Sequence, residues 1–107
     1  PDAWADRNFW GNELTLHATD PNQKITSERH NVDMGNVTVP HFGVHLDAIT
    51  FKNLKQRLID KNIKFIDPPY IRFKGEDIEQ ETMFLADPNG NCMEIKTMKN
   101  PNTLFKK

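Results

Sequence analysis

The stretch ETMFLADPNGNCMEIK, from Glu81 to Lys96, decides the fold of this chain. It predicts two strands joined by the tight turn Asp87–Gly90, because proline presets φ at the second turn position and glycine closes the turn. In the second strand Glu94 lies between Met93 and Ile95, where a carboxylate is costly unless another group pairs with it. Glu94 is therefore the first candidate for a functional residue.

The composition limits the classes of protein that this chain can belong to. With 107 residues it forms one domain at most. Its 14 basic and 15 acidic residues are interspersed and give a net charge of −1, which argues against a nucleic-acid-binding surface. No apolar run approaches the roughly 18 residues that cross a membrane. The single cysteine, Cys92, cannot form an internal disulfide and favours the cytoplasm, and no signal peptide is visible.

The first half of the chain predicts one hairpin and one long connection. Residues 4–17 have the pattern of two strands with a turn at Gly11-Asn12. Residues 18–39 are polar and show little hydrophobic pattern, so we expect a linker or a flexible flap there. The chain does not begin with methionine and enters a predicted strand at once, so we expect residues to be missing ahead of Pro1.

The second half predicts a β-α-β-β-β order, which makes the protein α+β. We expect a strand over 40–47 and a helix over 50–62, capped by Thr50, with its apolar stripe on Phe51, Leu54, Leu58 and Ile59. Strands over 63–66 and 70–73 follow, then the loop 74–80, the two opening strands, and a tail that Leu104 and Phe105 anchor. The helix covers one face of such a sheet, and the other face must meet a second unit, a partner chain or a ligand.

Three potential metal ligands share the polar face of their strands: His17, His41 and Glu94. Two imidazoles and one carboxylate suit zinc, nickel, iron or manganese. Each residue taken singly is also explained as a structural or surface side chain, and only the shared parity favours a metal site. Three further residues are candidates for contacts with a substrate: His45, Arg72 and Cys92. A structural or surface role is the alternative for each of them.

These segments carry a resemblance to a known family. The runs VPHFGVHLD (39–47), IKFIDPPYIRFKGE (63–76) and the opening stretch resemble the second half of a vicinal oxygen chelate protein. This superfamily contains glyoxalase I, bleomycin-resistance proteins, fosfomycin-resistance enzymes and extradiol dioxygenases. The D-P-x-G-N turn followed by M-E-I is its most recognisable segment. The run RNFWGNELTLH (7–17) resembles the last two strands of the first half.

The resemblance implies the glyoxalase/bleomycin-resistance/dioxygenase fold, built from two βαβββ modules around a metal. It divides the chain into the last hairpin of an incomplete first module (1–18), a linker (19–39), the second module (40–99) and a tail (100–107). The family takes its metal ligands from the first and last strands of each module. Carried over, these positions are His17, His41 and Glu94, and the fourth position falls in the first strand of module one, which the sequence does not contain.

The function that the resemblance implies is a glyoxalase-like, divalent-metal-dependent lyase or isomerase acting on a small oxygen-bearing substrate. Glu94 is then both a metal ligand and the candidate base. Two alternatives stay open: a metal-free antibiotic-binding resistance protein and an extradiol-type dioxygenase. An incomplete first module exposes sheet edges and apolar surface, so we also expect a homodimer, with neither nucleic acid nor a membrane as a partner.

Overall fold

The computed structural model describes residues 4–18, 20, 22, 28–32 and 35–105. It contains eight strands, one α-helix and a short 3₁₀ turn in these ranges. The elements are β1 (Trp4–Phe9), β2 (Asn12–His17), β3 (Glu28–Val32), β4 (Gly35–Val39), β5 (Phe42–His45), α1 (Ala48–Asp60), β6 (Asp67–Arg72), β7 (Gln80–Ala86), β8 (Cys92–Met98) and η1 (Pro101–Thr103). No helix in the described part of the chain is long and apolar enough to span a membrane.

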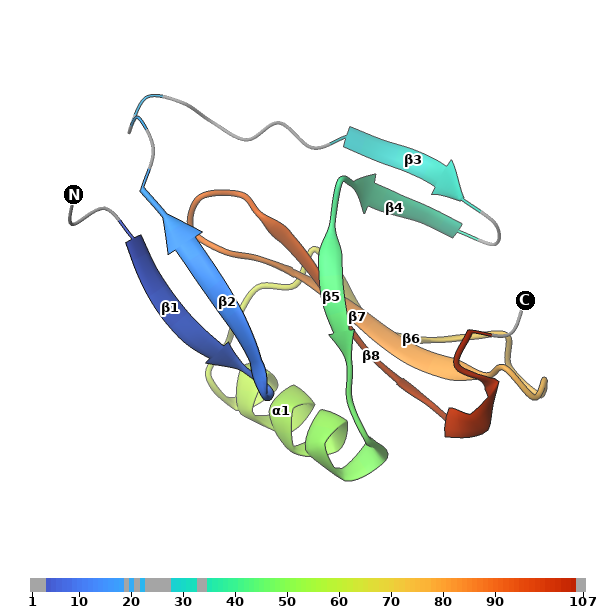
Figure 1. Cartoon of the computed structure of the whole chain (residues 1–107). Coiled ribbons are helices and arrows are strands. Elements are labelled where there is room, and N and C mark those ends of the chain that lie inside the picture. The colour runs from blue at the N-terminus through green and yellow to red at the C-terminus, as the bar shows by residue number, and fades with distance from the viewer. Residues whose placement is uncertain (1–3, 19, 21, 23–27, 33–34, 106–107) are drawn as a thin grey trace.

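The central element is a four-stranded sheet with the order β5-β8-β7-β6. β5 runs parallel to β8, and the other neighbours are antiparallel. With α1 between β5 and β6, this is the predicted βαβββ module (Figure 1), so the α+β fold class is confirmed. The β1–β2 hairpin precedes this module in the chain.

The opening stretch forms the β7–β8 hairpin at the centre of this sheet. The carboxylate of Asp87 closes its turn by accepting hydrogen bonds from the backbone N–H groups of Asn89 and Asn91, at 2.9 and 2.8 Å. Side chains alternate across the two strands, as the sequence predicts. Met83, Leu85 and Ile95 therefore point to one face, and the other face receives the remaining set: Thr82, Phe84, Cys92 and Glu94.

Helix α1 covers the first of these faces. Phe51, only 1% exposed, packs with Leu46, Met83, Leu85 and Ile95 in the main core. The helix begins two residues earlier than predicted, because Asp47 rather than Thr50 caps it: the carboxylate of Asp47 accepts hydrogen bonds from both the N–H and the hydroxyl of Thr50 at 2.8 Å.

Helix α1 ends at Asp60, two residues before the predicted end. Asn62, shortly after the helix, adopts a left-handed conformation with φ of 55°. Leu54 and Leu58 pack against the core, whereas Ile59, predicted to belong to the same stripe, is 47% exposed.

Strand β6 corrects the prediction for the segment between the helix and β7. No strand forms over residues 63–66; the strand starts at Asp67 and includes Pro68 and Pro69. β6 is an edge strand with β7 on one side. Proline has no backbone N–H, and an edge strand tolerates this because it has no second neighbouring strand in the sheet that would need the hydrogen bond. The register of β6 against β7 shifts between Asp67 and Tyr70, where the prolines stand.

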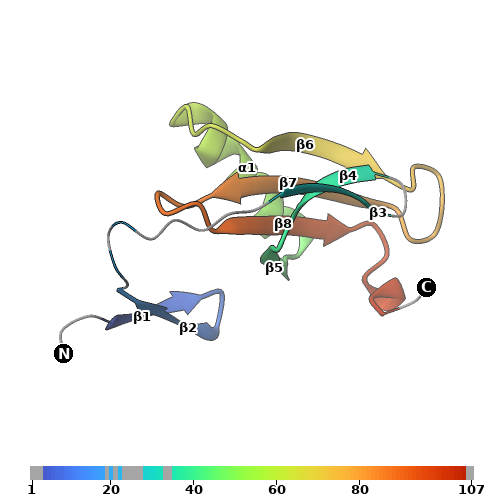
Figure 2. The same cartoon turned by 90° about the horizontal axis from the view of Figure 1, so that it is seen from above.

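The β3–β4 hairpin is the largest departure from the sequence-based expectation. Part of the polar segment over 18–39 pairs as an antiparallel hairpin instead of forming a structureless linker. Val37 of β4 is 2% exposed and packs with Phe84 and Cys92, so this hairpin covers the sheet face opposite α1. Figures 1 and 2 show it lying across β7 and β8. The face expected to be open is thus partly closed by the same chain.

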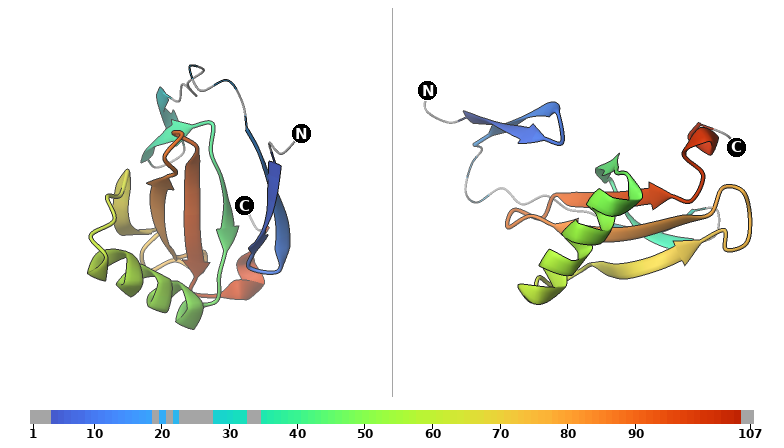
Figure 3. Two further views of the ribbon diagram at one scale, coloured as in Figure 1. Left: turned by 90° about the vertical axis from the view of Figure 1, so that its left-hand side faces the viewer. Right: turned by 90° about the horizontal axis from the view of Figure 1, so that it is seen from below.

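The two ends of the described chain lie outside the main core. The β1–β2 hairpin forms as predicted and lies beside the edge strand β5 (Figure 3), where the rings of Phe9 and Phe42 are 6.1 Å apart. In the tail, Thr103 is 1% exposed, whereas Phe105 is 93% exposed. The expectation that Phe105 anchors the tail is wrong, because Thr103 takes that role.

Candidate functional site

The main feature of the face opposite α1 is a contact between His41 and Glu94. The Nε2 atom of His41 lies 3.5 Å from Oε1 of Glu94. His41 comes just before β5, and Glu94 is in the middle of β8, so the parallel pairing of these two strands brings them together. Both side chains are largely covered, with 25% of His41 and 14% of Glu94 exposed.

Each of the two residues is held by a second partner. The hydroxyl of Thr82, on the neighbouring strand β7, donates a 2.6 Å hydrogen bond to Oε2 of Glu94. Nδ1 of His41 lies 2.7 Å from the backbone carbonyl of Thr38, at the end of β4. The edge of the His41 ring also contacts the ring of Phe84, with centroids 5.1 Å apart. The sheet and the β3–β4 hairpin together therefore fix both side chains.

The hydrogen bonds determine which atoms of the pair are free to bind. A carbonyl oxygen only accepts, so Nδ1 of His41 carries the proton and Nε2 presents a lone pair in the neutral ring. This lone pair faces a carboxylate oxygen of Glu94, which is also an acceptor. Two acceptors at this distance attract each other only when a proton or a cation lies between them.

A small cavity of about 300 Å³ opens at this pair. Glycine is required at position 43, because a Cβ there would overlap the backbone of Glu94 in the paired strand. The cavity is lined by His41, Phe42, Gly43, Val44, His45, Glu94 and Lys96. It thus combines a carboxylate, two imidazoles and one ammonium group in a space that suits a small polar molecule.

His45, one of the predicted substrate contacts, lines this cavity, and one nitrogen of its ring already has a partner. The N–H of Met98 donates a 3.2 Å hydrogen bond to Nε2 of His45. Burial lowers the pKa of His45, and the nearby charge of Lys96 lowers it further, so the neutral ring is favoured. Its Nε2 therefore has a structural partner, and the remaining ring atoms are what a molecule in the cavity would meet.

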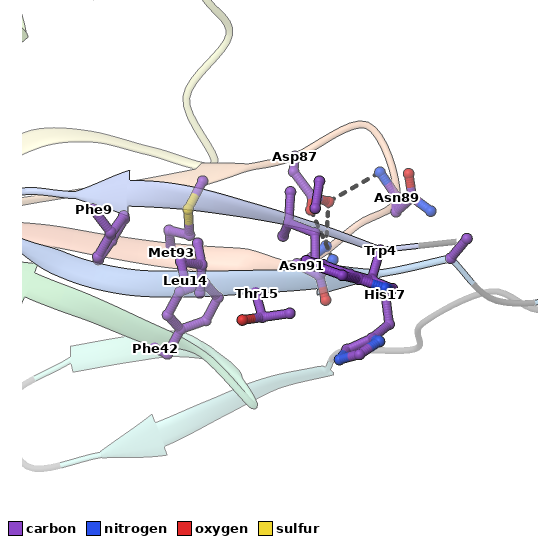
Figure 4. Close-up of a pocket in the computed structure, with 13 residues that line it drawn as sticks. Trp4, Phe9, Leu14, Thr15, His17, Phe42, Asp87, Asn89, Asn91 and Met93 are labelled. Carbon is purple, nitrogen blue, oxygen red and sulfur yellow. Dashed lines mark hydrogen bonds between the residues drawn. The ribbon is translucent and has the colours of Figure 1, made fainter. Parts of the chain in front are cut away.

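His17 does not join the other two predicted metal ligands. Leu14 of β2 is partly covered, whereas His17 falls on the opposite face of the hairpin and is exposed. It lines a second cavity of about 840 Å³, between the β1–β2 hairpin and the start of β8 (Figure 4). Among the described residues, no three histidine, cysteine or acidic side chains are close enough to hold one metal ion.

The second cavity is mainly apolar. Figure 4 shows Leu14, Phe42 and Met93 close together, with Asn89, Asn91 and Asp87 on the turn between β7 and β8. The aromatic residues that line it are Trp4, Phe9 and Phe42.

The last two predicted substrate contacts lie away from both cavities. Arg72 ends β6, and its guanidinium stacks over the ring of Phe73, 4.9 Å from the centroid. Cys92 is 3% exposed in the apolar cluster under the β3–β4 hairpin. Burial raises the pKa of the Cys92 thiol, as expected of an inert cysteine. Neither residue is among those that line the two cavities.

Sequence reasoning missed three residues of the site: Thr38, Thr82 and Lys96. Thr82 and Lys96 stand opposite each other in the β7–β8 register and lie on the same face as Glu94. The alternation of side chains in the sequence predicts this shared face. Thr38 acts through its backbone carbonyl, and no side-chain pattern reports such a contact.

Comparison with known proteins gives matches among solved structures. No protein-family model matches the chain, and no curated protein is significantly similar to it. A glyoxalase/bleomycin resistance protein/dioxygenase from Alicyclobacillus acidocaldarius is 26% identical, with a TM-score of 0.74 over 98% of this chain and 74% of its own. The chain thus spans about three quarters of the length of that neighbour.

A second structural neighbour is more distant in sequence. The genomically encoded fosfomycin resistance protein FosX from Listeria monocytogenes is 12% identical, with a TM-score of 0.56 over 88% of this chain and 64% of its own. At this identity the likeness concerns the fold alone. Both neighbours have the fold that the sequence predicts.

Proposed function

The chain belongs to the vicinal oxygen chelate superfamily, and from this premise we propose that it is a divalent-metal-dependent enzyme of the glyoxalase type. His41 and Glu94 are the two metal ligands that this chain contributes to the site, and Glu94 is also the catalytic base. The reaction is an isomerisation or a lyase reaction on a small substrate with neighbouring oxygens. We further propose that the enzyme works as a homodimer in the cytoplasm.

The observation that carries this proposal is the pairing of two lone-pair donors. The 3.5 Å between His41 Nε2 and Glu94 Oε1 is close to the roughly 3.4 Å that separates two ligand atoms of a tetrahedral zinc ion. Histidine ligands usually donate their other ring N–H to a carbonyl or carboxylate, as His41 does to Thr38. The residues present therefore fit one half of a metal site, and zinc, nickel, iron and manganese all accept this donor set.

Glu94, Thr82 and Lys96 have distinct parts in the proposed reaction. A bound metal would supply Lewis acidity toward two substrate oxygens. Thr82 holds one oxygen of Glu94 in place, and the other oxygen, which would bind the metal, would leave it to take a proton from the substrate. The ammonium group of Lys96 lies in the same cavity and favours a substrate that carries a negative charge.

Metal titration tests the proposal directly. Zinc, nickel and manganese are titrated in turn into the wild type, Glu94→Ala and His41→Ala, and the binding heat is measured by calorimetry. We expect binding in the wild type and at least a tenfold loss of affinity in both variants. A matched control is Glu81→Ala, which removes a carboxylate that pairs with Lys55 at 2.7 Å, away from the cavity. If the wild type binds none of these metals, the proposed function is wrong.

The second cavity favours a second candidate function, the metal-free binding of an aromatic cationic drug. The observation behind it is the large apolar cavity with aromatic walls and the carboxylate of Asp87 at its edge. The separation of His17 from His41 and Glu94 also agrees with a protein that binds without metal. Quenching of Trp4 fluorescence by aromatic cations such as bleomycin, absent in Phe42→Ser, would support this function over the enzymatic one.

A further inference from the structure

The guanidinium of Arg29 connects three strands on the face that carries His41. It forms two parallel hydrogen bonds with the carboxylate of Asp67 in β6, at 2.9 and 3.1 Å. It also donates to the hydroxyl of Thr38 at 3.2 Å and to the carbonyl of Asn36 at 2.7 Å. Arg29 belongs to β3, so this one side chain fastens both strands of the hairpin to the edge of the main sheet.

These contacts converge on the residue that holds His41. Arg29 binds the side chain of Thr38, and the backbone carbonyl of Thr38 accepts the hydrogen bond from Nδ1 of His41. The chain from Asp67 through Arg29 and Thr38 to His41 is continuous, and every link in it is 3.2 Å or shorter. The position of the β3–β4 hairpin therefore sets where the carbonyl that orients the imidazole lies.

Within the described part of the hairpin, one apolar side chain packs into the cluster on this face. That side chain is Val37. The other attachment is the set of hydrogen bonds from Arg29 to Asp67, Thr38 and Asn36, which we call the latch. The two parallel hydrogen bonds between a guanidinium and a carboxylate fix both the distance between the groups and their relative orientation. A single apolar contact does not fix orientation. A latch of this kind suits a carbonyl that must point in one direction.

We infer that Arg29 and Asp67 are positioning residues, which act through Thr38 to hold the neutral His41 in the tautomer with its proton on Nδ1 and its lone pair on Nε2. The inference deepens the proposed function and rests on it, since the lone pair of Nε2 is what a metal would bind. Groups that orient a histidine ligand typically contribute a factor of about 10–100 to metal affinity. We expect losses of that size when the latch is broken.

The experiment reads the tautomer of His41 by ¹⁵N NMR in the metal-free protein, at a pH where histidine is neutral. The variants are Asp67→Ala and Arg29→Lys; the second keeps the positive charge but cannot reach three partners at once. We expect the wild type to carry its proton on Nδ1 and both variants to show a mixture of tautomers. Lys55→Gln, which breaks the 2.7 Å ion pair with Glu81, is the matched control and should leave the tautomer unchanged.

Either of two outcomes would overturn the inference. His41 follows Thr38 by only three residues, so the local backbone alone could keep the hydrogen bond between them. If the tautomer is unchanged in both variants, or changes equally in Lys55→Gln, then Arg29 and Asp67 do not position His41. A variant is scored only if its circular dichroism spectrum matches that of the wild type.

The inference and the proposed function can fail separately. A shift of the tautomer in the latch variants supports the inference even if the wild type binds no metal, in which case only the proposed function is wrong. If the wild type binds zinc, we also expect both latch variants to bind it about 10–100-fold more weakly. A weaker affinity without any change of tautomer counts against the inference.

Discussion

At the scale of the residue, the two oxygens of Glu94 have different partners. One accepts a hydrogen bond from Thr82, which is completely buried, and the other faces His41. A carboxylate flanked by apolar neighbours is costly without such partners. The partners therefore explain why the strand tolerates Glu94, and the asymmetry between the two oxygens leaves one of them available for chemistry.

Thr82→Val should weaken metal binding without a loss of the fold. Valine has nearly the same shape as threonine but cannot donate the 2.6 Å hydrogen bond to Glu94. We expect a loss of about 10–100-fold in zinc affinity, measured by calorimetry, because an orienting partner of the ligand is removed. Thr82→Ser keeps the hydroxyl and should restore most of the affinity. Equal affinities in the wild type and Thr82→Val would contradict this role.

His45 should make stability depend on pH. Its pKa is lowered in the folded protein by burial and by Lys96, so the unfolded chain takes up a proton first as the pH falls. The free energy of unfolding should therefore decrease below about pH 6.5, the ordinary pKa of histidine, and level off below the folded pKa. Urea unfolding at pH 7.5 and 5.5 measures this decrease.

The control for that experiment is His45→Gln, which can still accept the hydrogen bond from Met98 but does not titrate. Other histidines contribute to the pH dependence of both proteins, so the difference between wild type and variant is the informative quantity. The wild type should lose more stability than the variant. If both lose the same amount, His45 is not buried as a neutral ring.

At the scale of the element, the approach of β5 to β8 is what brings His41 to Glu94. The parallel register places Gly43 opposite Glu94, and only the missing Cβ allows the two backbones to come this close. Without β5 at this distance, the His41 ring would lose its partner across the cavity. The glycine is thus a requirement of the site as well as of the sheet.

Gly43→Ala should destabilise the protein and separate these two strands. Forcing a methyl group into a filled space typically costs about 1–3 kcal/mol, and here the obstacle is backbone. Hydrogen exchange measured by NMR should rise at the amides shared by β5 and β8. Gly75→Ala is the comparison, since a Cβ there meets open space and its cost comes only from a φ of +84°. Unchanged exchange at β5 in Gly43→Ala would refute the expectation.

At the scale of the whole molecule, the main sheet has two hairpins beside it that differ in how they are attached. The β3–β4 hairpin is fastened by the ion pair of Arg29 with Asp67 and by Val37. The β1–β2 hairpin leaves large apolar side chains in contact with solvent, among them Trp4 at 59% and Leu16 at 44% exposure. Exposed apolar surface around a cavity is typical of a surface that binds another molecule.

We expect this surface to support a dimer. Sedimentation velocity should show a dimer of the wild type at micromolar concentration, and Phe42→Ser should weaken it at least tenfold, because burying a phenylalanine contributes about 1.5–3 kcal/mol. Ile49→Ser is the control, since Ile49 is 73% exposed and does not line the cavity. A wild type that stays monomeric would contradict the prediction.

The sequence by itself determined the local features. The alternation of side chains in the opening stretch and in residues 40–47 correctly placed Glu94 on the face that meets His41, and the spacing of Phe51, Leu54 and Leu58 identified the helix. These patterns are readable because strand and helix geometry depend on neighbours only a few residues apart.

The tertiary structure decided which of these faces meet. His17 has the predicted strand parity, yet the β1–β2 hairpin places it at the second cavity, whereas His41 and Glu94 line the first. Likewise, Arg29 and Asp67 are 38 residues apart, and nothing local joins a guanidinium in a polar segment to an edge strand. Periodicity fixes the side of an element on which a residue lies, whereas contacts between distant elements depend on how separate surfaces pack.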